Sequence, residues 1–207
     1  MTSSTAIHSD LIRTLMDEHL VISRALLVLK HTIQTINKRQ PPPLADCRAL
    51  IRFFKQYADR IHHYSEEEIL FVTLQRTRDI SIRTMIDKLS TQHVIGRMLV
   101  AQMDESLADA RLARRGWRLK FIENGRAYHT LLTIHICDED HVFFPAADRV
   151  LRKRRTARAK LRAPQVPTKH TLELSISRLE RKHGLTRSRS GCGEIGCESI
   201  CGHHDCH

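Results

Sequence analysis

The stretch that decides the fold is residues 82–107, which read IRTMIDKLSTQHVIGRMLVAQMDESL. Its small and apolar positions recur at alternating steps of four and three residues, the spacing that places side chains on one face of an α-helix. These positions are Ile82, Ile86, Leu89, Gly96, Val100, Met103 and Leu107. His93 stands in the middle of the stripe, where a leucine would be expected. The stretch therefore predicts a long amphipathic helix with a histidine on its buried face.

Three other segments show the same period and predict helices over residues 9–38, 44–76 and 117–148. The run Pro41-Pro42-Pro43 ends the first, because proline cannot supply an amide donor to a helix interior. The stripe of the second includes Tyr57 and Tyr64, which are predicted to be buried. Four such helices joined by short loops predict an all-α fold, an up-down-up-down four-helix bundle over residues 8–155.

The C-terminal part differs in composition. Residues 156–190 are predicted to form a basic linker with a short helix over His170–His183, and residues 191–207 form a Cys/His-rich tail. The chain carries a net charge of +11, and its basic residues are concentrated here: Lys+Arg number 20 against 18 Asp+Glu up to Asp148, and 14 against 5 after it. The basic character therefore belongs to the tail rather than to the bundle.

Two observations bear on location. The sequence has no apolar run of about 20 residues, so a membrane span is not expected. The N-terminal stretch MTSSTAIHSDLIRT lacks the charged start and apolar core of a secretory signal. The sequence predicts a soluble cytoplasmic protein that does not engage a membrane.

Histidines and glutamates lie on the stripes of all four predicted helices, each near mid-length. The candidate ligands are His19, His63, Glu67, His93, His135 and Glu139. In both His-x-x-x-Glu pairs the two side chains leave the same helix face. Residues at mid-length on four bundle helices converge on one layer of the core, and this set of nitrogen and carboxylate ligands suits redox-active iron. The alternative is a group of ordinary buried histidines and ion pairs.

The second helix offers two overlapping pairs. His62 and Glu66 have the same spacing as His63 and Glu67. At about 100° per residue, however, His62 and Glu66 point largely away from the apolar stripe. The helical period therefore predicts that His63 and Glu67 are the inward pair.

Four motifs carry a family resemblance. They are LMDEHLVI (15–22), IHHYSEEEILF (61–71), TQHVIGR (91–97) and HICDEDHVFFP (135–145). In this order they resemble the helix motifs of hemerythrin-like, or HHE cation-binding, domains over residues 8–150. The resemblance implies a non-haem centre of two iron ions. It also implies that the four histidines are terminal ligands and that Glu67 and Glu139 bridge the ions.

The third and fourth motifs depart from the oxygen-carrying hemerythrins. Those proteins have a second histidine one turn after the first on the third helix, whereas this chain has Arg97 there. The last carboxylate is Glu139, four residues after His135, although Asp140 occupies the alternative position. A site with four histidines and two carboxylates resembles the members that sense small molecules, handle iron, or react with peroxide or nitric oxide.

The tail has a ligand cluster of its own. It consists of Cys192, Cys197, Cys201, Cys206, His203 and His204, with His207 at the end. The spacing is not that of a standard zinc ribbon. A second metal site for zinc, copper or an iron–sulfur cluster is one interpretation, and a redox-active thiol cluster or a disordered end are the others.

The residues leave three functions open. The first is a di-iron protein that senses or handles oxygen, nitric oxide, peroxide or iron. The second is an enzyme that uses the same site to act on peroxide or nitric oxide. The third is a regulatory module that engages a protein partner through its tail. The run Arg149–Arg162 is dense in Arg and Lys, which suits nucleic acid or another polyanion, or else a solvated helix end.

Overall fold

The computed structural model of the protein describes residues 10–38, 42–153 and 168–185. Every regular element in these ranges is helical. The first bundle helix is α1 (Asp10–Thr35) and the third is α4 (Ile80–Arg111). The second consists of α2 (Leu44–Phe53), η1 (Phe54–His63), η2 (Glu66–Phe71) and α3 (Val72–Leu74). The fourth consists of α5 (Trp117–Asp138), η3 (Glu139–Phe143) and α6 (Phe144–Lys153).

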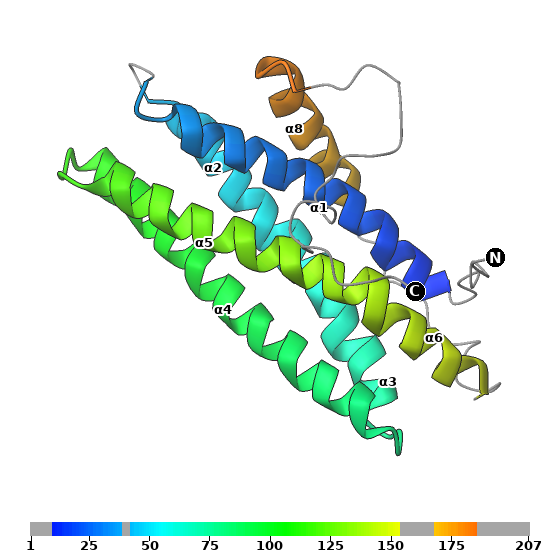
Figure 1. The fold of residues 1–207 in the computed structure, drawn as a ribbon. Coiled ribbons are helices and arrows are strands. Elements are labelled where there is room, and N and C mark those ends of the chain that lie inside the picture. Colours follow the sequence, from blue (N-terminus) through cyan, green and yellow to red (C-terminus); the bar gives the residue numbers. More distant parts are fainter. Residues whose placement is uncertain (1–9, 39–41, 154–167, 186–207) are drawn as a thin grey trace, which may run out of the picture.

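These four helices run side by side as a bundle (Figure 1), which confirms the predicted all-helical class. Local sequence fixes the ends of the third and fourth helices. The Asp79 side chain accepts a hydrogen bond from the Ile82 amide and so caps the start of α4. Gly116 has a φ of 84° in the turn before α5, a left-handed conformation that glycine adopts without strain.

A fifth helix, α8 (Lys169–Lys182), lies along the outside of α1 and the second bundle helix (Figure 1). It confirms the helix predicted over 170–183. Leu172, Ile176 and Leu179 share its buried face and join the larger apolar core. None of the helices in the described part of the chain is long and apolar enough to span a bilayer.

Buried apolar side chains form two separate clusters. The larger includes residues from Ile22 to Ile33 on α1 and from Val100 to Leu107 on α4. The smaller includes residues from Leu11 to Leu15 on α1 and from Ile82 to Leu89 on α4. The buried histidines and glutamates lie between the two clusters along the same helices. A polar layer therefore crosses the middle of the bundle.

The two buried glycines of the bundle helices should respond oppositely to an added methyl group. A Cβ on Gly125 would lie 2.9 Å from Ile33 Cδ1, whereas one on Gly96 would meet nothing closer than Tyr128 Cε2 at 3.5 Å. We expect Gly96→Ala to raise the free energy of unfolding by about 1 kcal/mol through helix propensity. Gly125→Ala should lower it by about 1–2 kcal/mol, because overpacking outweighs that gain. Urea unfolding measures both, and equal shifts would contradict the packing described.

Candidate metal centre

Seven buried side chains form the polar layer, which we call the ligand layer. They are His19, His62, His63, Glu66, His93, His135 and Glu139. Each is at most 3% exposed. All four bundle helices contribute, since the layer draws on α1, the η1–η2 region, α4 and the α5–η3 junction. Two groups of four can be drawn within it, and the ligand atoms of each group lie within 4.8 Å of one another.

The first group contains three imidazoles and one carboxylate, and the second contains two imidazoles and two carboxylates. The first is His63, Glu66, His93 and His135; the second is His19, His62, Glu66 and Glu139. Glu66 belongs to both groups. Its Oε2 lies 3.4 Å from His93 Nε2 and its Oε1 lies 3.6 Å from His62 Nε2, so its two oxygens face opposite groups.

Glu139 belongs to the second group, but one of its oxygens also contacts the first. Its Oε2 lies 3.2 Å from His19 Nε2 in one group and 3.2 Å from His135 Nε2 in the other. A carboxylate that lies close to imidazoles of both groups can be shared by two cations. The layer therefore has the donor set of a two-metal centre with two shared carboxylates.

Outer partners turn the Nε2 atoms of four imidazoles toward the centre of the layer. Each of these imidazoles has its Nδ1 within hydrogen-bond distance of an acceptor oxygen. The pairs are His19 with Asp140 at 2.7 Å, His62 with Glu18 at 3.0 Å, His93 with Glu67 at 2.7 Å and His135 with Gln92 at 2.9 Å. A carboxylate or carbonyl oxygen only accepts, so Nδ1 donates and Nε2 is left to ligate. This arrangement is typical of metal-binding histidines.

Several atoms of the layer have no partner in hydrogen-bonding geometry, although three of the four carboxylate oxygens lie 3.2–3.6 Å from imidazole nitrogens. They are both carboxylate oxygens of Glu66 and Glu139 and both ring nitrogens of His63. A buried polar atom without a partner is costly, and a buried carboxylate is more so. A bound cation would satisfy these atoms together. The residues present therefore fit a metal centre better than they fit a self-contained set of ion pairs.

The predicted orientation of the second-helix pairs was right for His63, which lies in the ligand layer, but wrong for Glu67 and for His62 and Glu66. Glu66 is fully buried in the ligand layer, whereas the Glu67 side chain is 28% exposed and bonds to His93 Nδ1 and Arg97. Tyr64, expected on the buried stripe, is 51% exposed. The reason is that η1 and η2 are π-helical. Their i→i+5 bonding advances each residue by less than the α-helical 100°, so the extrapolated phase fails across this region.

The π-helical turns also change the number of imidazoles. His62 was expected to point outward, yet His62 and His63 are both buried in the layer, one in each group. The layer therefore contains five imidazoles rather than the four predicted. The only signal in the sequence was the pair of overlapping His-x-x-x-Glu spacings, which α-helical geometry alone could not satisfy together.

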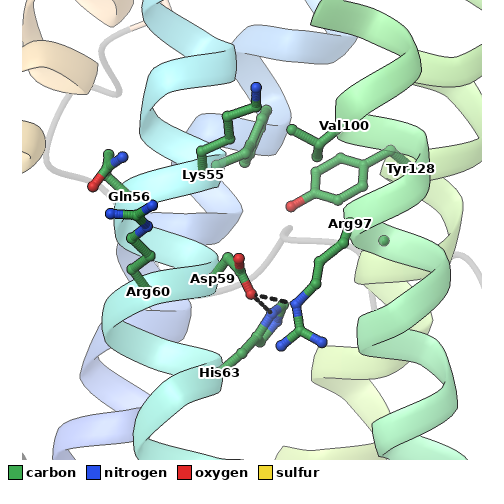
Figure 2. A pocket seen from close by; sticks show the side chains of 10 residues that line it. Lys55, Gln56, Asp59, Arg60, His63, Arg97, Val100 and Tyr128 are labelled. Carbon is green, nitrogen blue, oxygen red and sulfur yellow. Dashed lines mark hydrogen bonds and ion pairs between the residues drawn. The ribbon is translucent and has the colours of Figure 1, made fainter.

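A cavity of about 270 Å³ lies beside His63 of the ligand layer, between η1 and α4. Figure 2 shows His63 at one end of it, with dashed lines from the Asp59 carboxylate to both His63 and Arg97. Arg97 donates to Asp59 Oδ1 at 2.7 Å and to Glu67 Oε1 at 2.6 Å. Asp59 Oδ1 in turn lies 3.8 Å from His63 Nδ1, and Glu67 bonds to His93. Arg97 therefore orients the two carboxylates behind the imidazoles of the first group.

The charges within the layer shift several pKa values. Burial opposes protonation of His19, but Asp140 and Glu139 overcome it and raise its pKa to about 10. Burial opposes protonation of His93 as well, and Glu66 and Glu67 raise its pKa to about 9. For His63, burial and the neighbouring imidazoles both act downward, so its pKa lies well below the usual value. His63 is therefore neutral and ready to ligate, whereas His19 and His93 carry protons in the metal-free protein.

The structure does not test the predictions for the C-terminal tail. The proposed second site at Cys192, Cys197, Cys201, Cys206, His203 and His204 lies outside the described residues, and so does most of the basic run Arg149–Arg162. Both stay predictions.

Comparison with known proteins agrees with the geometry. Residues 10–159, well over half of the chain, match the model of the hemerythrin HHE cation-binding domain. No curated protein and no solved structure gave a significant match. The matched range spans the four bundle helices and all seven residues of the ligand layer. The chain belongs to the hemerythrin HHE cation-binding domain family.

Proposed function

We propose that the ligand layer holds a pair of iron ions, bridged by Glu66 and Glu139, and that the protein uses them to sense or handle oxygen, nitric oxide, peroxide or iron. The observation that carries the proposal is the sharing of two buried carboxylates between two groups of imidazoles. Imidazoles suit ferrous iron and carboxylates stabilise the ferric state. Iron bound there would supply reversible redox chemistry and an affinity for small diatomic molecules or peroxide.

The two halves of the layer differ in a way that supports ligand binding. His63, His93 and His135 serve the first group, but only His19 and His62 provide imidazoles to the second. A group with fewer protein nitrogens leaves room for an exogenous ligand. Phe144 stacks on the His19 ring with centroids 5.4 Å apart, so an apolar side chain borders the second group. A small molecule is therefore expected to bind on the His19 and His62 side.

An optical experiment tests this function. Ferrous-loaded protein should change its near-ultraviolet spectrum on exposure to oxygen, nitric oxide or peroxide. His62→Ala should reduce the change far more than His63→Ala, because His62 belongs to the group with the open position. Equal effects would contradict the asymmetry. Sustained turnover of peroxide or nitric oxide would assign the protein to the enzymes rather than to the sensors. A cytoplasmic location stays a prediction from the sequence.

Metal affinity should depend steeply on pH. His19 and His93, with pKa values of about 10 and about 9, must each lose a proton before Nε2 can ligate. At pH values below these pKa values, each rise in pH weakens the competition of protons with the metal ion for Nε2. The apparent affinity is therefore expected to rise with pH, by about 10-fold per pH unit for each proton released. Zn²⁺ titrations of the metal-free protein between about pH 6 and 8 measure the slope. A flat profile above pH 7 would show that neither histidine carries a proton.

A further inference from the structure

Helix α8 lies beyond residues 10–159, the part of the chain that matches the family. It nevertheless packs directly on the bundle, and Leu172, Ile176 and Leu179 insert into the larger apolar core. This fifth helix is therefore an addition to the four helices that hold the ligand layer (Figure 1).

Polar contacts tie α8 to the bundle along its length. In the first half of α8, Glu173 accepts a hydrogen bond from the Tyr57 hydroxyl at 2.9 Å, and in its last turn Glu180 pairs with Arg24. Near its C-terminal end, Lys182 donates to Asp46 at 2.6 Å. These contacts fix the position of α8 without touching the ligand layer.

The contact at the N-terminal end of α8 is different, because it leads into the ligand layer. Lys169 Nζ donates to Glu18 Oε1 at 2.6 Å. The other oxygen of Glu18, Oε2, lies 3.0 Å from His62 Nδ1. Glu18 is only 1% exposed, so Lys169 and His62 are its partners in place of water. A residue outside the family domain thus completes the hydrogen bonding behind one imidazole of the layer.

We propose that Lys169 is a positioning residue for His62, acting through Glu18, so that metal binding in the ligand layer and docking of α8 stabilise each other. This inference rests on the proposed function. Lys169 keeps the Glu18 carboxylate charged and in place, and Glu18 holds His62 with Nε2 facing inward. Without Lys169, the buried carboxylate would have a single partner, which favours its movement toward water. His62 would then lose its fixed orientation.

The loss of the fixed His62 orientation should weaken metal binding mainly at one of the two positions. His62 belongs to the group with only two imidazoles, so a disordered His62 weakens that position far more than the other. Coupling between two binding events is reciprocal: if docking of α8 favours the metal, the metal must favour docking of α8. Through this coupling, a partner that binds α8 would alter metal binding on the His19 and His62 side of the centre.

A pair of lysine variants in the full-length protein tests the coupling. Lys169→Met and Lys182→Met remove the same side chain from opposite ends of one helix, and each leaves a buried carboxylate, Glu18 or Asp46. Outer-sphere partners of metal-binding histidines typically change affinity by about 10–100-fold. We expect Lys169→Met to weaken the lower-affinity of the two Zn²⁺ positions by about 10-fold and to leave the other nearly unchanged. Lys182→Met should change neither by more than about 2-fold.

Hydrogen exchange of the α8 amides supplies a readout that needs no activity. Exchange should slow when Zn²⁺ is added to the wild-type protein, and the slowing should be lost in Lys169→Met but kept in Lys182→Met. Glu18→Gln, which keeps hydrogen-bonding atoms but removes the charge, should behave as Lys169→Met does. Equal effects of the two lysine variants, or α8 exchange that ignores the metal, would overturn the coupling. A wild-type protein that binds no metal would instead overturn the proposed function.

Discussion

Glu66→Gln is expected to prevent the ligand layer from holding a pair of metal ions. Glu67→Gln should leave both ions in place. Glu66 is fully buried, its oxygens face opposite groups of imidazoles, and neither oxygen has a hydrogen-bond partner. An amide cannot bridge two cations as a carboxylate does, so the pair of ions loses a shared ligand. Glu67 orients His93 from outside the layer, and its loss should lower affinity by about 10-fold.

The adjacent position of the two glutamates makes them matched controls. Both variants exchange one carboxylate for an amide on the same π-helical segment, so their effects on helix propensity and net charge are the same. Metal analysis after equilibrium dialysis, together with helical content by circular dichroism, measures the comparison. The opposite order, with Glu67→Gln losing both ions and Glu66→Gln keeping them, would mean that the second helix follows the α-helical phase.

His63→Leu and His62→Leu should change the stability of the metal-free protein in opposite directions. Both ring nitrogens of His63 are buried without a hydrogen-bond partner, and the low pKa of His63 keeps the ring neutral. Leucine removes an unsatisfied group and leaves no charge unpaired, so the free energy of unfolding should rise by about 1–3 kcal/mol. His62 bonds to Glu18, and its removal leaves that buried carboxylate with Lys169 alone. The free energy of unfolding should then fall by about 1–3 kcal/mol.

Adding metal should cancel the gain from His63→Leu. A ligand that binds only the folded state stabilises it in proportion to the logarithm of its concentration over Kd, so a protein that binds metal well gains more. Wild-type protein in excess Zn²⁺ should therefore become more stable than His63→Leu, which reverses their order in the metal-free state. Urea unfolding with and without Zn²⁺ provides the data. Destabilisation of the metal-free protein by His63→Leu would identify His63 as an ordinary packed core residue.

The sequence predicted the helices and part of the ligand layer for a physical reason. On α1, α4 and α5 the α-helical period is regular, so the stripe positions of His19, His93 and His135 place them on the buried face. On the second helix the period changes within η1 and η2, and the prediction exchanged Glu66 for Glu67. No local feature of the sequence marks where a π-helical turn begins.

The hydrogen-bond partners of the imidazole Nδ1 atoms could not be predicted from the sequence either. Asp140 is 121 residues from His19, and Lys169 is 151 residues from Glu18. Such pairs depend on how the helices are rotated against one another. The apolar period within each helix gives no information on that rotation. The apolar face of α8 was readable from Leu172, Ile176 and Leu179, but the surface that it covers was not.

Anaerobic titration of the metal-free, full-length protein with Fe²⁺ tests the central claim most directly. The account predicts that binding saturates at about two ions per chain, one for each group of four possible ligands. It further predicts that a near-ultraviolet band appears when the loaded protein meets air. Saturation at one ion or none would contradict a two-metal centre built from five histidines and two glutamates.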